Sequence, residues 1–129
     1  MDMLIEPGIR PVCDALNRLD DVRTLWSCEG HPFRVSRPYV VFEAPEAVAF
    51  RLHKKIHPES VDASLEYCWW LTANFRPDGR LQWCLEPNCN IPRWRYLPFL
   101  RRKVDAELVR LAALIETTLI RKGSNDLYA

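Results

Sequence analysis

The stretch "LEYCWWLTANFRPDGRLQWCLEP", residues 65–87, decides the fold, because apolar and polar side chains alternate on both sides of a turn. Such alternation is typical of half-buried strands. In the turn, Pro77 and Asp78 suit type I geometry, and Gly79 can adopt the left-handed conformation that closes a bulged hairpin. The stretch therefore predicts an antiparallel hairpin, whose inner face carries Leu65, Tyr67, Trp69, Leu71, Ala73 and Phe75, followed by Leu81, Trp83 and Leu85.

The hairpin also limits disulfide formation. If Phe75 pairs with Leu81, Thr72 lies opposite Cys84. Cys68 is then about four strand residues away from Cys84 along the sheet, roughly 13 Å at the usual rise. A disulfide needs Cα atoms within about 7 Å, so we expect this pair to stay reduced. Because an odd number of cysteines also argues against a disulfide framework, we expect free thiols at Cys13, Cys28, Cys68, Cys84 and Cys89.

The remaining elements follow from periodicity and from proline and glycine positions. Helical spacing and strand-forming residues predict, in chain order, a helix from Pro11 to Leu19, strands over Val22–Cys28 and Tyr39–Glu43, a helix from Pro45 that ends at His57–Pro58, and a long helix from Pro98 to about Lys122. With the hairpin, the order is α-β-β-α-β-β-α. We expect a two-layer α+β fold, with a four-stranded, mostly antiparallel sheet and helices on one face.

Composition narrows the class of protein. The chain has 129 residues, 48% of them hydrophobic, which suits a single globular domain over residues 1–129. The formal net charge of +1 gives no global reason to bind nucleic acid. No run approaches the roughly eighteen apolar residues that span a bilayer, and the start of the chain lacks signal-peptide features. We expect a cytoplasmic protein with no membrane partner.

The stretch "SCEGHP", Ser27–Pro32, interrupts the hydrophobic pattern at the end of the first strand and opens a long loop. Long loops at strand ends often carry function. As a catalytic set, Cys28 would be a nucleophile activated by His31, with Glu29 orienting the base. As a site for a small anionic ligand, the loop would use Ser27, Gly30, Arg34 and Arg37. The alternative is turn chemistry around a buried thiol.

Metal binding has weaker support in the spacing. A four-ligand zinc set can be written from Cys28, His31, Cys84 and Cys89. The tight Cys-x2-Cys pairs of structural zinc sites are absent, however. His53 and His57 lie four apart, but the glutamate of a metalloprotease helix does not follow His53. We therefore expect neither a metal nor a cofactor.

Two further stretches suggest interactions with macromolecules. Pro92–Lys103 interleaves aromatic and basic residues, a pattern typical of proteins that bind single-stranded nucleic acid. Such a surface would contact the nucleic acid or another anion through Arg93, Arg95 and Arg101. The near-neutral charge favours the alternative, in which the aromatics are core and the arginines pair with acidic residues. The long helix carries a second apolar line, Val109, Ala113 and Ile120, which would suit a homodimer.

Five residues in "IRPVCDALNRLDDVRTLWSCEG" resemble a known family: Asn17, Thr24, Ser27, Cys28 and Gly30. The pattern looks like the start of the tRNA wybutosine-synthesising methyltransferase family, the third enzyme of that pathway. The resemblance implies an S-adenosylmethionine-dependent enzyme that acts on RNA, with the Ser-Cys-Gly turn near its site. The family's basic residue after the glycine is here His31. The pattern "SCEGHP…PYVVF" is also similar to small bacterial and phage proteins, which implies no particular function.

Three functions thus remain open. The first is a small domain with a ligand-binding or active-site loop at Ser27–Pro32, and the residues do not decide whether a reaction takes place there. The second is an interaction module, a homodimer or a protein- or RNA-binding domain, in which the turn is structural. The third, implied by the resemblance alone, is an RNA-modifying methyltransferase-like protein.

Overall fold

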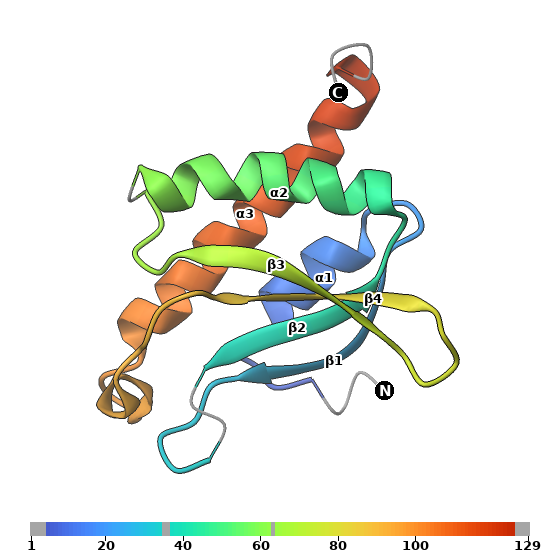
Figure 1. The fold of residues 1–129 in the computed structure, drawn as a ribbon. Coiled ribbons are helices and arrows are strands. Elements are labelled where there is room, and N and C mark those ends of the chain that lie inside the picture. The colour runs from blue at the N-terminus through green and yellow to red at the C-terminus, as the bar shows by residue number, and fades with distance from the viewer. Residues whose placement is uncertain (1–4, 35–36, 63, 126–129) are drawn as a thin grey trace.

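The structure, a computed structural model, describes residues 5–34, 37–62 and 64–125, with side chains as far as Thr118. Figure 1 shows the predicted order of helices and strands. The elements are α1 (Arg10–Asn17), β1 (Arg23–Glu29), β2 (Pro38–Glu43), α2 (Glu46–Val61), β3 (Trp69–Phe75), β4 (Leu81–Pro87), the short 3-10 helix η2 (Arg93–Tyr96) and α3 (Arg102–Asn125). The α+β fold expected from the sequence is confirmed.

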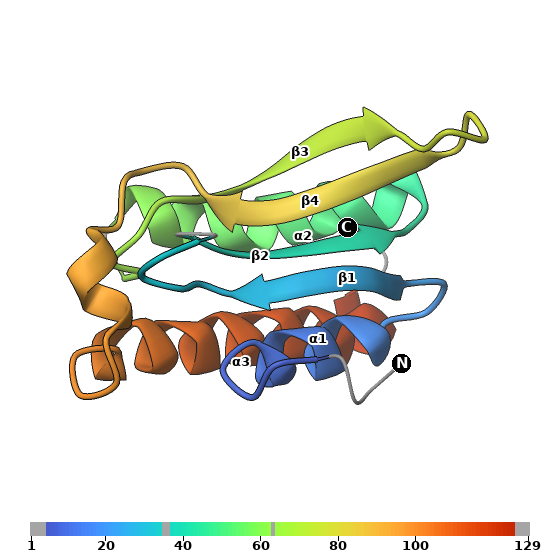
Figure 2. The ribbon, with the colours of Figure 1, turned by 90° about the horizontal axis from the view of Figure 1, so that it is seen from below.

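The strands form one four-stranded sheet in the order β1-β2-β4-β3, and its strand pairs are antiparallel (Figure 2). β2 and β4 are therefore central, and β1 and β3 are edges. The predicted hairpin register is confirmed: Phe75 pairs with Leu81, and Thr72 pairs with Cys84. All five cysteines are free, as expected.

One face of the sheet and the three helices share a single apolar core. β2 and β4 contribute Val40, Phe42 and Leu85 to it. The helices contribute Val12, Leu16, Leu52, Ile56, Leu108, Leu111 and Ile115. The predicted inner face of the hairpin is buried at its start, where Trp69 lies, but Phe75 is 71% exposed. The hairpin's turn end therefore lacks the cover that the helices give its other end.

Two predicted helix boundaries were wrong. The helix expected to end at His57–Pro58 continues through Pro58 to Val61. Proline removes one donor and strains a helix interior, but tertiary contacts can offset this cost. Here Ser60, in the last turn, is buried and exchanges hydrogen bonds with the backbone N–H and carbonyl of Trp69, at 3.0 and 3.4 Å. The turn is thereby tied to β3.

The C-terminal helix starts later than predicted, at Arg102 instead of Pro98. A separate turn precedes it, closed by bonds from the N–H groups of Leu100 and Arg101 to the carbonyl of Leu97, at 2.8 and 3.0 Å. On the second apolar line of this helix, Val109 and Ala113 are exposed, and the side chain of Ile120 lies outside the described residues. Within the part of the chain that the structure covers, no helix is both apolar and long enough to cross a membrane.

Candidate functional site

The loop after β1 turns sharply at Gly30, which has a φ of 89°. Side chains other than glycine rarely adopt this conformation. The ring of Tyr96 also lies against the turn, so that a Cβ on Gly30 would fall 2.5 Å from a ring carbon. The N–H of Gly30 donates to Sγ of Cys28 at 3.4 Å. Close packing and backbone conformation together require glycine at this position.

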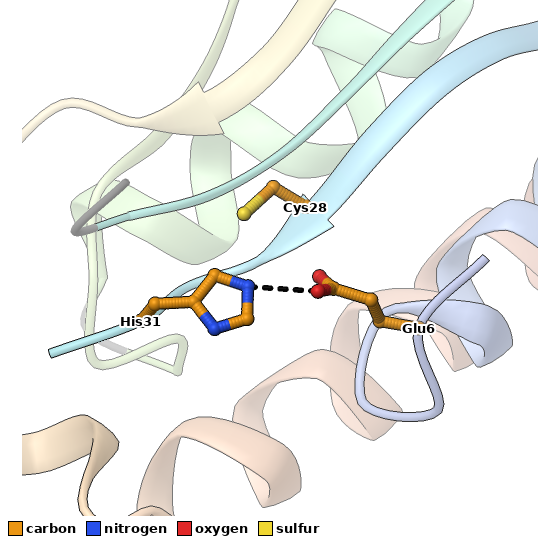
Figure 3. Close-up of side chains that lie close together, drawn as sticks. All are labelled: Glu6, Cys28 and His31. Atoms are coloured by element: carbon orange, nitrogen blue, oxygen red, sulfur yellow. Dashed lines mark ion pairs between the residues drawn. The ribbon is translucent and has the colours of Figure 1, made fainter. Parts of the chain in front are cut away.

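The turn brings His31 to Glu6, a residue that precedes α1. Nε2 of His31 lies 2.8 Å from Oε2 of Glu6. Sγ of Cys28 completes a group in which one donor atom from each residue lies within 4.8 Å of the others (Figure 3). The three side chains are only partly accessible: His31 and Glu6 are 18% and 29% exposed, and Cys28 is buried. The structure thus gathers a thiol, an imidazole and a carboxylate from two separate segments.

Glu6 occupies the place that the sequence suggested for Glu29. The carboxylate of Glu29 accepts the N–H of Gly8 at 2.7 Å, away from the imidazole. The N–H of Glu29 donates to Oε1 of Glu6 at 2.9 Å. These two bonds link the segment before α1 to the end of β1. Sequence reasoning missed Glu6 because Glu-Pro-Gly near the chain start matches no catalytic motif, and no spacing relates it to His31.

Arg101 holds the turn at Glu29 and Gly30 through its guanidinium. Its guanidinium donates to the carbonyls of Glu29 and Gly30, at 3.1 and 3.2 Å, and pairs with Asp105 at 2.9 Å. Protein acceptors lie at all three nitrogens of the guanidinium, which leaves few of its five N–H protons for a phosphate. The expectation that this arginine pairs with an acidic residue is confirmed, and Arg101 holds the turn in place. The accompanying expectation that the aromatic residues of this stretch are core holds for Tyr96 but is wrong for Trp94 and Phe99, which are 51% and 82% exposed.

The other two arginines of the predicted anion surface, Arg93 and Arg95, contact different parts of the protein. Arg93 donates to the carbonyl of Pro32 at 3.2 Å. Arg95 stacks over the ring of Trp94, 4.8 Å from its centroid, and lies 3.8 Å from Glu66. Each arginine therefore has a protein partner, so the three predicted cations do not form one open cluster.

The residues predicted to bind a ligand are only partly brought together. Arg34 is exposed and lies 3.9 Å from Glu6, at the edge of the site. Arg37 instead lies 3.5 Å from Glu86 on β4. Ser27 pairs with Val40, whose side chain lies in the core, so Ser27 belongs to the face of the sheet that the helices cover. Of these three, only Arg34 is placed to meet a ligand at the cluster.

The state of Cys28 follows from its surroundings. Burial raises the pKa of the thiol, the N–H of Gly30 lowers it, and the charge of Glu6 raises it. The net shift is upward, so the thiol is mostly protonated at neutral pH. A Cys-His-acid relay presents one imidazole nitrogen to the thiol and the other to the acid. Figure 3 shows that Nε2 of His31 faces both groups here, whereas Nδ1 points away.

The zinc set written from the sequence is not assembled. Cys84 lies within β4 opposite Thr72, and Cys89 is exposed beyond the end of that strand. Among the residues that the structure describes, the group of three donors close enough to share an ion is Glu6, Cys28 and His31. Two members of the predicted set, Cys28 and His31, therefore lie close together. The carboxylate of Glu6 lies beside them, where the prediction had the thiols of Cys84 and Cys89.

The residues that carry the family resemblance have structural roles in this fold. Asn17 and Thr24 exchange two hydrogen bonds, Nδ2 to Oγ1 at 2.9 Å and backbone N–H to Oδ1 at 3.0 Å. This pair closes the connection between α1 and β1. Gly30 is required by the turn, as described above. The resemblance itself remains a prediction, because comparison of the chain with protein-family models, curated proteins and solved structures finds no match.

Proposed function

We propose that this protein binds a small anionic ligand at a site formed by the Ser27–Pro32 loop and Glu6. The observation that carries the proposal is the convergence of Glu6, Cys28 and His31, drawn from two segments, at a partly open position. Groups of titratable side chains in such positions are common at functional sites.

Two features suit an anion. Arg34 lies at the edge of the cluster with an exposed guanidinium. The imidazole of His31 is held by Glu6, at 2.8 Å, and its side chain is 18% exposed. The ion pair would orient the imidazole, and the ligand's negative charge would meet Arg34. A reaction after binding, with Cys28 as the nucleophile, is a separate prediction that binding alone does not test. A cytoplasmic location also stays a prediction.

The test compares two arginines of the same loop. Binding of inorganic phosphate and of acetate would be measured by calorimetry and by the rise in unfolding temperature. Arg34→Ala should abolish most of the binding, because this side chain lies at the cluster. Arg37→Ala, whose partner is Glu86, is the matched control and should bind normally. Equal loss in both variants, or no binding in the native protein, would contradict the proposal.

A second candidate is an interaction module that pairs with another copy of the chain. Side chains along a strand alternate between the two faces of the sheet. Val40 and Phe42, which flank Val41 in β2, lie in the core shared with the helices. Val41 and its pairing partner Trp26 therefore belong to the opposite face of the sheet, and Trp26 is 51% exposed. An exposed tryptophan on a sheet face that the helices do not cover is a feature of protein interfaces.

Light scattering over a range of concentrations tests this candidate. If the sheet face pairs, Trp26→Ser should shift the protein toward the monomer. If the exposed line of α3 pairs, Val109→Ser should do so instead. A native protein that stays monomeric at all concentrations would exclude the candidate. The methyltransferase-like function needs separate experiments, a titration with S-adenosylmethionine and a measurement of RNA binding at several salt concentrations.

A further inference from the structure

The cluster has a geometric property that anion binding does not use. The thiol of Cys28 and the carboxylate of Glu6 both face Nε2 of His31 (Figure 3). Three lone-pair donors that face a shared position are arranged as ligands around an ion. We propose that Glu6, Cys28 and His31 are the protein ligands of a transition-metal ion of the zinc class, bound through a carboxylate oxygen, Sγ and Nε2. The inference rests on the proposed function only in placing the site in the same loop.

The observed distances are close to what such an ion requires. Zinc bonds of about 2.0–2.3 Å in tetrahedral geometry place neighbouring ligand atoms about 3.3–3.5 Å apart. The Nε2–Oε2 pair, now at 2.8 Å, would have to open slightly. The donor atoms all lie within 4.8 Å of one another, so no pair would have to close by more than about 1.5 Å to reach those spacings. Small side-chain rotations supply movements of this size.

The charges also match. A thiolate and a carboxylate together carry two negative charges, which a divalent cation neutralises. On binding, the Sγ–H bond breaks, its electron pair forms the bond from sulfur to the metal, and the proton passes to solvent. Nε2 of His31 would bind through its lone pair, as it does in the neutral tautomer that carries its proton at Nδ1. Binding therefore releases protons and strengthens as pH rises.

The donor types select the metal. Thiolate and imidazole favour zinc, cobalt and copper, whereas magnesium and calcium prefer sites made of oxygen ligands alone. Three protein ligands leave a fourth position of a tetrahedral ion for water or for an exogenous group. Arg34, 3.9 Å from Glu6, is near enough to assist an anion that binds the metal.

Surrounding hydrogen bonds hold the ligands, as they do in known metal sites. The second oxygen of Glu6 accepts the N–H of Glu29 at 2.9 Å. Sγ of Cys28 accepts the N–H of Gly30 at 3.4 Å, a contact that remains available to a thiolate. Arg101 in turn holds the carbonyls of Glu29 and Gly30. The turn that carries the thiol and the imidazole is thus built before any ion binds.

Cobalt is the probe, because its spectrum reports both the thiolate and the geometry. The full chain, stripped with a chelator, would be titrated with Co²⁺ and then with Zn²⁺ in competition. We expect one ion per chain, a sulfur-to-cobalt charge-transfer band and the strong visible bands of a tetrahedral site. Cys28→Ser should remove the charge-transfer band. Glu6→Gln should keep that band but weaken zinc binding by more than about tenfold.

Two controls locate the ion. Cys89→Ser removes an exposed thiol far along the chain and should leave the spectrum unchanged. The double variant His53→Ala, His57→Ala removes the other imidazole pair, whose rings stack with centroids 5.0 Å apart, and should also bind normally. A spectrum without the sulfur band, loss of binding in either control, or unchanged affinity in Glu6→Gln would overturn the inference. If Cys28→Ser does not fold, Glu6→Gln alone decides the outcome.

The two proposals can fail separately. Phosphate and acetate titrations would be run on metal-free and zinc-loaded protein with Arg34→Ala beside each. Anion binding without stoichiometric metal would leave the proposed function in place and exclude the metal. Metal binding that responds to the variants as expected, without anion binding in either form, would retain the metal site and exclude an anion as its ligand.

Discussion

Two carboxylates illustrate the difference between a structural and a functional polar group in this protein. Glu107, in α3, is fully buried and accepts four hydrogen bonds. One oxygen accepts the N–H of Glu66 and a guanidinium proton of Arg110, at 3.1 and 2.8 Å. The other accepts the N–H of Tyr67 and the indole N–H of Trp69, at 2.9 and 3.0 Å. Both oxygens thus accept two hydrogen bonds each, and the donors on Oε2 are buried.

Glu6 is different in each respect. It is 29% exposed, and one oxygen accepts the N–H of Glu29. The other faces the imidazole of His31, with the thiol of Cys28 close by. Imidazoles and thiols change protonation state and bind metals, whereas backbone amides do neither. A carboxylate saturated by backbone and side-chain N–H donors fixes the fold, and one that faces an imidazole and a thiol can exchange these partners for an ion or a ligand.

The largest expected effect is a difference in the free energy of unfolding between Glu107→Gln and Glu6→Gln. In Glu107→Gln, an NH₂ group at the Oε2 position leaves the buried N–H groups of Tyr67 and Trp69 without an acceptor, and at the Oε1 position it faces the N–H of Glu66 and the guanidinium of Arg110. We expect a loss of about 3 kcal/mol in the free energy of unfolding. Glu6→Gln keeps an acceptor for the N–H of Glu29 and should cost about 1 kcal/mol or less. Denaturant unfolding measures both, and equal losses would contradict the distinction.

A second test concerns the turn that presents the cluster. Gly30→Ala places a methyl group in a left-handed conformation and against the ring of Tyr96, which we expect to cost about 2–3 kcal/mol. Gly79 has the same φ of 89°, but a Cβ there meets no atom within 4 Å. Gly79→Ala is therefore the matched control, with a cost of about 1 kcal/mol. The difference between the variants measures the contact with Tyr96, and its absence would show that the turn tolerates a side chain.

Thiol reactivity provides a third test. Burial raises the pKa of Cys84 to about 11, from a usual value of 9.0. At pH 8 its thiolate fraction should be about a hundredfold lower in the folded than in the unfolded protein. Cys28 should also be alkylated slowly, whereas the exposed Cys68 and Cys89 should react first. Mass spectrometry of partially alkylated protein gives the order, and early labelling of Cys84 would contradict it.

The same shift predicts how stability depends on pH. Since the unfolded Cys84 thiol ionises near pH 9 and the folded one near pH 11, the unfolded state binds fewer protons between these values. Stability should therefore fall as pH rises from about 9 to about 11. In Cys84→Ala this alkaline loss should be smaller. An unchanged pH profile in the variant would show that other groups cause the loss.

The smallest effect is expected at the pair that links α1 to β1. Asn17→Ala removes both hydrogen bonds to Thr24, at an exposed position, and should cost about 0.5–1 kcal/mol. Cobalt and phosphate binding should not change, because this pair lies outside the cluster. Altered binding in Asn17→Ala at preserved stability would indicate that the residues of the family resemblance act in function as well as in folding.

Much of the fold could be predicted from the sequence, because its signals are local. Alternation along residues 65–87 and the Pro77–Gly79 turn determine a hairpin whose register, Phe75 to Leu81, is the observed one. Helix ends were less predictable: Pro58 has a clear local preference, and the bonds between Ser60 and Trp69 override it. A contact between distant residues leaves no periodic trace in the sequence.

The candidate site divides in the same way. The sequence alone placed Cys28 at the end of the first strand and Gly30 and His31 in the turn that follows, because strand periodicity stops there. Only the tertiary structure brought Glu6 to His31 and turned Glu29 toward Gly8. The reason is physical: the turn depends on the conformations of neighbouring residues, whereas the carboxylate's position depends on how the segment before α1 pairs with the end of β1.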